Sequence, residues 1–389
     1  MKGSKQILCI LIAIAGFSNV HAQLSDPPLQ IFGYFQNSFT HQTLSEDDPE
    51  QNSFNMQQLN LFFQKKLGKN WRAFVNFEFI NSFSSSRQWG AANLEEAWAA
   101  YSKNEKFNLK LGLLLPIFNN LNEFKNRTPL LPYVIRPLAY ETSFQEFLPV
   151  EDFAPARAFV QAYGFLATKK FKFDYAAFLG NSPNIAAQNP LEPDERAQTG
   201  IDTTNSFTVG GRLGLRYNDD FKVGFSTTQD KTNIFANIQD DLFLPSSQFG
   251  NVTRRRYGGD LSFNLKKISF ESEFILVRHD EDFEQADLDR DFYYLTAGYR
   301  INEELFIYAS FWHARLDYTI AAILDDQVSV IVVKGDVDVP NIGFAYNLND
   351  RITLKGHFAK VDEFEQVPTL QIYESDKFYH LNAAISIFF

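Results

Sequence analysis

Basic side chains recur at alternate positions of several segments, with apolar residues between them. Arg212 and Arg216, for example, flank Leu213 and Leu215. Residues two apart in a β-strand point to the same face, so this spacing gathers guanidinium and ammonium groups on one face. Rings of Arg and Lys favour anions over cations. Charge-selective passage of solutes is therefore the chemistry that these residues can perform.

A larger set of polar residues follows the same alternation, and we predict that it lines one face of the strands or a constriction between them. These candidates are Asn60, Gln64, Asn76, Glu78, Glu96, Lys110, Arg127, Arg136, Arg157, Arg212, Arg216, Arg254, Arg256, Arg300, Lys355 and His357. The carboxylates Asp174, Asp260, Glu271 and Glu273 are expected on the same face. For any single Arg of the set, two roles stay open: an ion pair with a neighbouring carboxylate, or contact with a solute.

The histidines give no support for a catalytic site. Beyond residue 22 they are His41, His279, His313, His357 and His380. None belongs to an H-x-S arrangement, and a nucleophile needs a base within hydrogen-bond reach. We therefore expect no enzymatic activity, no cofactor and no metal site.

Residues 1–22 have the features of a secretory signal peptide, so we expect one exported domain over 23–389. Two lysines precede a short apolar core, 7–17, and Ala22 ends a small-residue cleavage site. The core is shorter than the roughly 20 residues of a membrane-spanning helix. It contains the only cysteine, Cys9. The exported chain is therefore expected to have no disulfide.

Composition argues against a nucleic-acid partner. The 389 residues carry a formal net charge of -11, and removal of the two N-terminal lysines makes it about -13. Of all residues 16% are aromatic, and 41 are Phe. A chain so rich in both Phe and charge must separate its apolar and polar surfaces.

Strict alternation of apolar and polar residues separates them over the whole exported chain. Leu109, Leu111 and Leu113, for example, alternate with Asn108 and Lys110. Such segments reach the roughly 9–11 residues that cross a bilayer as a tilted strand. We predict about sixteen strands, an even number as in bacterial barrels. Their approximate ranges are 29–40, 54–67, 71–83, 92–103, 106–115, 156–168, 171–180, 206–218, 221–230, 254–266, 268–279, 290–301, 304–317, 338–348, 351–361 and 377–389.

Short turns alternate with long polar segments between these strands. The short turns include 68–70, 169–170 and 349–350, and the long segments include 318–337 and 361–375. This alternation is typical of an up-and-down barrel with tight periplasmic turns and long external loops.

The predicted fold class is therefore all-β, a transmembrane up-and-down antiparallel barrel. In hydrocarbon every backbone polar group must be paired within the protein, which a closed barrel achieves. Strand 377–389 must then pair with strand 29–40. A soluble sandwich rarely needs so many strands of one pattern, and a propeller should repeat a motif every ~40–50 residues. A barrel of about 16–18 strands encloses an aqueous channel.

The longest connection, 116–155, is expected to fold into the lumen. It contains six prolines and many Phe, Leu and Tyr residues. Apolar groups need a surface to pack on, and prolines reduce the entropy lost in holding one shape. Arg127 and Arg136 belong to this segment and are candidates for the constriction. The alternative is an external loop that packs on a neighbouring protomer.

Four stretches carry a resemblance to a known family: "GYFQ" at 33–36, "LNLFFQKKLGKNWRAFVNFEF" at 59–79, "LEEAWAAY" at 94–101 and "KFNLKLGLLLPIF" at 106–118. The chain resembles the phosphate-selective porin O and P family. The resemblance implies a sixteen-strand trimeric porin whose third long loop folds into the pore. Phosphate-selective members use a lumen ladder of Arg and a ring of Lys. Here "MQQLNLFF" at 56–63 has glutamines where a more basic run would suit anions.

The expected function is an outer-membrane porin of a Gram-negative bacterium. It would form a water-filled channel for passive diffusion of small polar solutes and ions, with a weak preference for phosphate-like anions. Its expected partners are outer-membrane lipid, these solutes, and further copies in a homotrimer. The alternative is a structural outer-membrane barrel that anchors a secretion or surface complex without an open pore.

Overall fold

The structure is a computed structural model that describes residues 27–43, 50–80, 91–140, 156–182, 206–218, 220–232, 252–280, 288–324 and 327–389. The predicted signal peptide and part of the long connection, 141–155, lie outside the described residues. No helix within these ranges is long and apolar enough to span a membrane.

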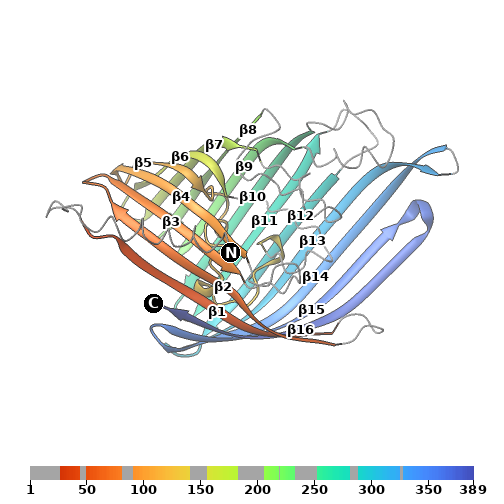
Figure 1. Ribbon diagram of the computed structural model, residues 1–389. Helices are drawn as coiled ribbons and strands as arrows, with labels where there is room; N and C mark the ends of the chain where they lie inside the picture. Colours follow the sequence, from red (N-terminus) through yellow and green to blue (C-terminus); the bar gives the residue numbers. More distant parts are fainter. Residues whose placement is uncertain are drawn as a thin grey trace, which may run out of the picture.

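Sixteen antiparallel strands form one closed barrel in the described part of the chain (Figure 1). They are β1 Gln30–Thr43, β2 Gln51–Lys66, β3 Trp71–Ile80, β4 Ala91–Asn104, β5 Phe107–Leu114, β6 Arg157–Ala167, β7 Phe171–Asn181, β8 Phe207–Tyr217, β9 Phe221–Thr232, β10 Val252–Leu265, β11 Ile268–Asp280, β12 Leu288–Arg300, β13 Leu305–Leu324, β14 Gln327–Asn349, β15 Ile352–Val367 and β16 Ile372–Phe388. Each strand pairs with its neighbours in the chain, and β16 pairs with β1. The predicted fold class is confirmed.

The seam between the first and last strands closes the barrel as the sequence predicts. Tyr34 lies opposite Phe388 in the register of β1 and β16. The Gly33 amide donates to the Phe389 carbonyl at 2.9 Å, and the Phe389 amide donates to the Gly33 carbonyl at 3.0 Å. The backbone ladder therefore extends to the last residue of the chain.

Alternation along the strands separates an apolar outer face from a largely polar inner face. Leu213 on β8 is 69% exposed, whereas its neighbour Arg212 is 3% exposed. Phe77 and Leu111 are also exposed on the outer face, as predicted. Rings on the outer face next to the short turns, where a girdle is expected, are Trp71, Tyr101, Tyr217, Phe221 and Tyr299. We call this end of the barrel the short-turn side.

Two predicted long loops are wrong, because their residues belong to strands. Most of 318–337 lies in β13 and β14, which have 20 and 23 residues. Segment 361–375 is divided among β15, the 3-10 helix η4 (Pro368–Leu370) and β16. Strand length was limited in the prediction to what a bilayer spans, but antiparallel pairing continues beyond it. These strands project farther than the others in Figure 1.

Candidate pore and constriction

The segment between β5 and β6 is described over 115–140, and this part lies inside the barrel. It includes the 3-10 helices η2 (Thr128–Leu130) and η3 (Leu138–Tyr140). Its apolar side chains, among them Phe118, Leu121 and Leu138, form one buried cluster with inward residues of β11–β16. The wall residues of that cluster are Ile275, Val277, Phe292, Tyr294, Trp312, Ala314, Val337, Val339, Ala359, Val361, Phe378 and Ala384. The apolar composition of the segment is thus matched by an apolar patch on the inner wall.

Close approach of the segment to β10 depends on a glycine. A Cβ atom on Gly258 would lie 2.2 Å from Asn119 Oδ1 and 2.8 Å from a ring carbon of Phe118. Nearby, the Asn119 amide donates to Ser226 Oγ at 2.9 Å. A side chain at position 258 would therefore displace the start of the segment from the wall.

Lys355 on β15 holds the middle of the segment. Its Nζ donates to the backbone carbonyls of Thr128, Pro129 and Tyr133 at 3.0, 3.2 and 3.3 Å. The same Nζ lies 2.9 Å from Gln36 Oε1 on β1. The ammonium group is almost fully buried, so these four oxygens replace its water shell. Lys355 therefore acts as an anchor for the segment.

Glu273 on β11 is a second anchor. Its Oε1 accepts hydrogen bonds from the amides of Asn120 at 2.9 Å and Leu121 at 2.7 Å. Its Oε2 accepts a hydrogen bond from the Tyr140 hydroxyl at 2.6 Å. Burial and the neighbouring Glu273 carboxylate raise the pKa of Tyr140 well above its ordinary value. The hydroxyl therefore remains a donor.

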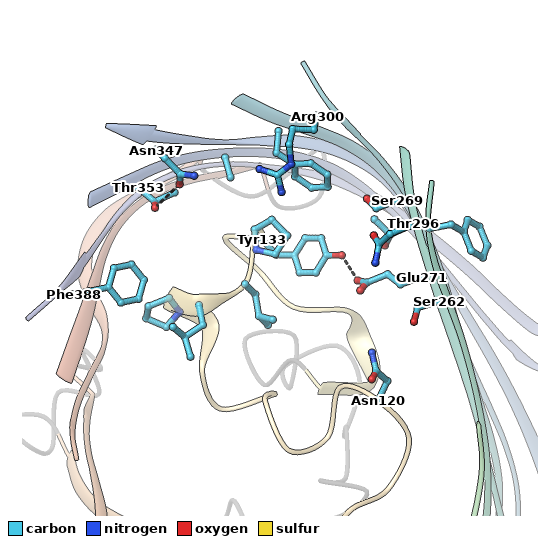
Figure 2. A pocket seen from close by; sticks show the side chains of 18 residues that line it. Asn120, Tyr133, Ser262, Ser269, Glu271, Thr296, Arg300, Asn347, Thr353 and Phe388 are labelled. Atoms are coloured by element: carbon cyan, nitrogen blue, oxygen red, sulfur yellow. Dashed lines mark hydrogen bonds between the residues drawn. The ribbon is translucent and has the colours of Figure 1, made fainter. Parts of the chain in front are cut away.

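Glu271 holds the segment one layer closer to the short turns. It accepts a hydrogen bond from the Tyr133 hydroxyl, which points from the segment to the wall in Figure 2. Burial and the Glu271 carboxylate raise the pKa of Tyr133 well above its ordinary value. Two wall carboxylates are thus paired with two tyrosines of the segment.

The opposite wall, β2–β4, binds the same segment through amides and a salt bridge. Arg127 Nη2 lies 3.0 Å from Glu96 Oε1. Gln58 Nε2 donates to the Asn126 carbonyl at 2.5 Å and to Glu78 Oε1 at 2.7 Å. Arg127 therefore faces an acidic side chain of the wall.

Arg136 has a different role, because it folds back on its own segment. Its Nη1 donates to the Lys125 carbonyl at 2.5 Å and to Asn126 Oδ1 at 3.3 Å. These contacts stabilise the shape of the segment.

The predicted arginines of β8 and β10 are paired with carboxylates. Arg212 contacts Asp174 and, at 2.7 Å, Asp260. Arg216 lies 3.3 Å from Asp174. The sequence left two roles open for these arginines, an ion pair or contact with a solute. The distances show ion pairs within the wall.

Arg254 and Arg256 share one carboxylate, that of Asp230 on β9. Both lie 2.8 Å from it, and Arg256 also donates to Thr228 at 3.2 Å. All three charged side chains are buried. The arginines thus contribute less free positive field than their number suggests.

The remaining candidates are distributed around the inner wall. Asn60 donates to Asn76 at 2.9 Å, and His357 lies 3.0 Å from the Tyr308 hydroxyl. Gln64 donates to Gln30 at 3.0 Å. The other three follow: Arg157 begins β6 and donates to the Ala156 carbonyl, Lys110 lies 3.7 Å from Glu123, and Arg300 ends β12 with its guanidinium 5.9 Å from the Phe306 ring.

Several residues of the site were missed by the sequence prediction. Gln36 and Gln58 donate to backbone carbonyls of the segment, and Asp230 joins two arginines. Each lies two positions from a buried inward residue of its own strand, Tyr34, Asn60 and Thr228 respectively, so the strand period places it on the inner face. Nothing in that pattern shows which inward residues meet the segment, since this depends on where the segment crosses.

One cavity beside the described part of the segment is largely polar. It has a volume of about 490 Å³ and lies between the segment and β10–β15 on the short-turn side. Arg300, Asn347 and Thr353 point into it in Figure 2. The other polar lining residues are Asn120, Ser262, Asn264, Ser269, Glu271 and Thr296. Such a lining suits hydrated ions and small polar solutes.

The second cavity is largely aromatic, and we call it the aromatic cavity. It has a volume of about 460 Å³ and lies between the segment and β1–β5. Its rings are Phe32, Tyr34, Phe62, Phe74, Trp98, Phe124, Phe388 and Phe389. Leu130 and Phe388 line both cavities, so the turn around Leu130 divides them.

A closed barrel with a polar inner face and an inward segment is the architecture of a membrane channel. Residues 8–365 match the Gram-negative porin family. The chain belongs to this family, and the fold and family together indicate an outer-membrane channel for small solutes. The search of curated proteins gave no match.

Solved structures of similar fold are outer-membrane proteins. The anion-selective porin from Comamonas acidovorans has a TM-score of 0.62 and 13% identity, over 93% of this chain and 99% of that chain. The outer membrane channel DcaP of Acinetobacter baumannii has a TM-score of 0.55 and 10% identity, over 94% and 99%. The trimer form of OmpT from Vibrio cholerae has a TM-score of 0.55 and 10% identity, over 93% and 100%. At such identities the likeness concerns the fold.

Proposed function

We propose that the protein is a porin whose water-filled lumen lets small polar solutes and ions diffuse passively across the outer membrane. The observation that carries this proposal is the arrangement of segment 115–140. Anchored by Lys355, Glu273 and Glu96, it crosses the lumen and leaves a polar cavity of about 490 Å³ on one side. The candidate residues act in this proposal as pore lining, and we assign them no catalytic role.

The selectivity we propose is a weak preference for anions, phosphate among them. Arg212 is neutralised by Asp260, whereas Arg254 and Arg256 share the one carboxylate of Asp230, so the positive charge of these arginines is reduced but not cancelled. Basic side chains that line the two cavities, such as Arg300, provide the remaining positive field. The fold is shared with an anion-selective porin, which supports the sign. The limited free charge supports a weak rather than a strict selectivity. We also propose that the protein belongs to the phosphate-selective O and P group.

We further propose a homotrimer in outer-membrane lipid, formed after cleavage of residues 1–22. One solved structure of similar fold is a trimer form. The apolar outer face, with Leu213, Val209 and Phe225 exposed, suits both lipid and protein neighbours.

Planar bilayers test the channel directly. Purified protein should produce stepwise conductance, and a KCl gradient should give a reversal potential of the sign expected for chloride preference. A zero-current baseline from folded protein would contradict the proposal, and a reversal potential of the opposite sign would contradict the anion preference.

A structural barrel that anchors a surface complex is the second candidate, and one observation favours it. β13 and β14, with 20 and 23 residues, are about twice the length that a membrane requires. Their projecting ends extend the paired strands outside the membrane, where a partner would bind. If the protein is a porin, removal of 316–335 should leave its conductance unchanged. If it is an anchor, the same deletion should abolish binding of the partner.

A further inference from the structure

The wall of the aromatic cavity is a continuous row of stacked rings on four neighbouring strands. Phe32 of β1 stacks on Phe62 of β2, with ring centroids 5.1 Å apart. Phe62 stacks on Phe74 of β3 at 5.6 Å, and Phe74 stacks on Trp98 of β4 at 4.9 Å. A row of stacked rings along a cavity wall suits packing against a flat apolar body.

Two cations lie beside Trp98, the last ring of this row. In the register of β3, β4 and β5, Arg72 lies opposite Ala100, and Ala100 lies opposite Lys110. The middle position therefore holds only a methyl group. The Arg72 guanidinium carbon is 5.1 Å from the Trp98 ring centroid, and Lys110 Nζ is 4.8 Å from it. Both cations are thus beside the same indole and close to the same small residue.

The charges that line this cavity favour an anion. Three basic side chains, Arg72, Lys110 and Arg127, are accompanied by two acidic ones, Glu96 and Glu123. The acidic groups lie next to Arg127, at 3.0 Å, and Lys110, at 3.7 Å. Among the described residues, the contact of Arg72 is with an aromatic ring rather than a carboxylate. One positive charge is therefore in excess within an otherwise apolar space.

We propose that the aromatic cavity binds small organic anions with a flat apolar body, of which aryl carboxylates are the simplest. The carboxylate lies beside Trp98, between Arg72 and Lys110, and the body packs along Phe62 and Phe74. A cavity of about 460 Å³ is within the roughly 300–1,000 Å³ typical of small-molecule sites. The inference rests on the proposed function, since a diffusion channel supplies the route by which such solutes reach the site.

Direct binding of benzoate to the folded protein in detergent tests the site. Isothermal titration should give saturable binding of benzoate, and no saturable binding of its neutral isostere benzamide or of acetate. Arg72→Gln should weaken benzoate binding by about tenfold or more, because a charge-assisted contact is lost. Lys172→Gln is the matched control, since Lys172 also lies over an aromatic ring, 4.1 Å from Phe165, but outside the cavity.

The outcomes separate this inference from the proposed function. Equal binding of benzoate and benzamide, or no benzoate binding, overturns the site. Unchanged benzoate binding in Arg72→Gln also overturns the site. If Arg72→Gln does not fold, Lys110→Gln replaces it, and unchanged benzoate binding in that variant overturns the site. Bilayer currents are the second measurement. Absence of conductance overturns the proposed channel, whereas the presence of the binding site is still tested by the benzoate titration. An open channel should show benzoate-dependent flicker that Arg72→Gln removes.

Discussion

The two halves of the inner wall meet the same segment in different ways. On the β10–β15 side the wall carries hydroxyls, amides, Glu271 and Arg300 around a cavity of about 490 Å³. On the β1–β5 side it carries stacked rings and two cations around a cavity of about 460 Å³. Because the volumes are nearly equal, size does not distinguish the cavities. Solutes would be sorted here by surface chemistry: hydrated ions on one side, flat organic anions on the other.

Loss of the Lys355 anchor is the strongest way to break this division. Lys355→Met leaves the carbonyls of Thr128, Pro129 and Tyr133 without their donor, which should weaken docking of the turn by about 3 kcal/mol. The turn that separates the cavities would then move, and single-channel conductance in a planar bilayer should rise.

The control for this variant is Lys360→Met on the same strand. Lys360 pairs with Asp362 at 2.6 Å on the outer face and makes no contact with the described part of the segment. Its conductance should equal that of the unchanged protein. A folded Lys355→Met protein with unchanged conductance would contradict the role of the turn as a divider.

A smaller effect is expected from Tyr140→Phe, which removes one bond of the segment to the β11 wall. The hydroxyl donates to the buried Glu273 carboxylate at 2.6 Å, so its loss should cost about 1.5 kcal/mol of the free energy of unfolding. Urea unfolding in detergent measures this. Tyr346→Phe is the control, because that hydroxyl donates to Glu304 at 3.3 Å in an exposed position. Equal losses in both variants would show that the anchor contributes little.

The smallest effect concerns charge in the polar cavity. A unit charge about 7 Å from a passing ion in water contributes about 0.6 kcal/mol, and salt screens part of it. Arg300→Gln should therefore lower the chloride-to-potassium permeability ratio by about twofold, as measured by the reversal potential. Benzoate binding should stay unchanged. A loss of benzoate binding in this variant would show that the two cavities act as one.

Strand pattern predicted much of this architecture. Alternation fixes which residues share a face, so the inward positions of Asn60, Arg212 and Lys355 followed from the sequence. The pairing of β1 with β16 followed from the need for closure. The extension of β13 and β14 into 318–337 was missed because it exceeds the length of a membrane span, although its residues have the β-branched composition of strands.

The alternation of residues along the strands could not predict which side chains meet across the lumen. Lys355 and Thr128 are 227 positions apart, and no local periodicity relates them. The shared carboxylate of Asp230 depends on the register of β9 with β10, which places Arg254 opposite it. A one-residue change of register would turn every side chain of a strand to the other face. Prediction of such pairs therefore requires the register of each strand with its neighbours.

Closure between Gly33 and Phe389 also determines how the protein must assemble. The contacts of this seam join opposite ends of the barrel sequence, and contacts of such high order form slowly because a long chain must be ordered first. Until β16 arrives, β1 and β15 each present an unpaired edge, which hydrocarbon does not tolerate and which invites pairing with other chains. The barrel therefore closes only after the last strand has paired with both edges. A chain that lacks it should aggregate or be degraded rather than insert as a smaller barrel.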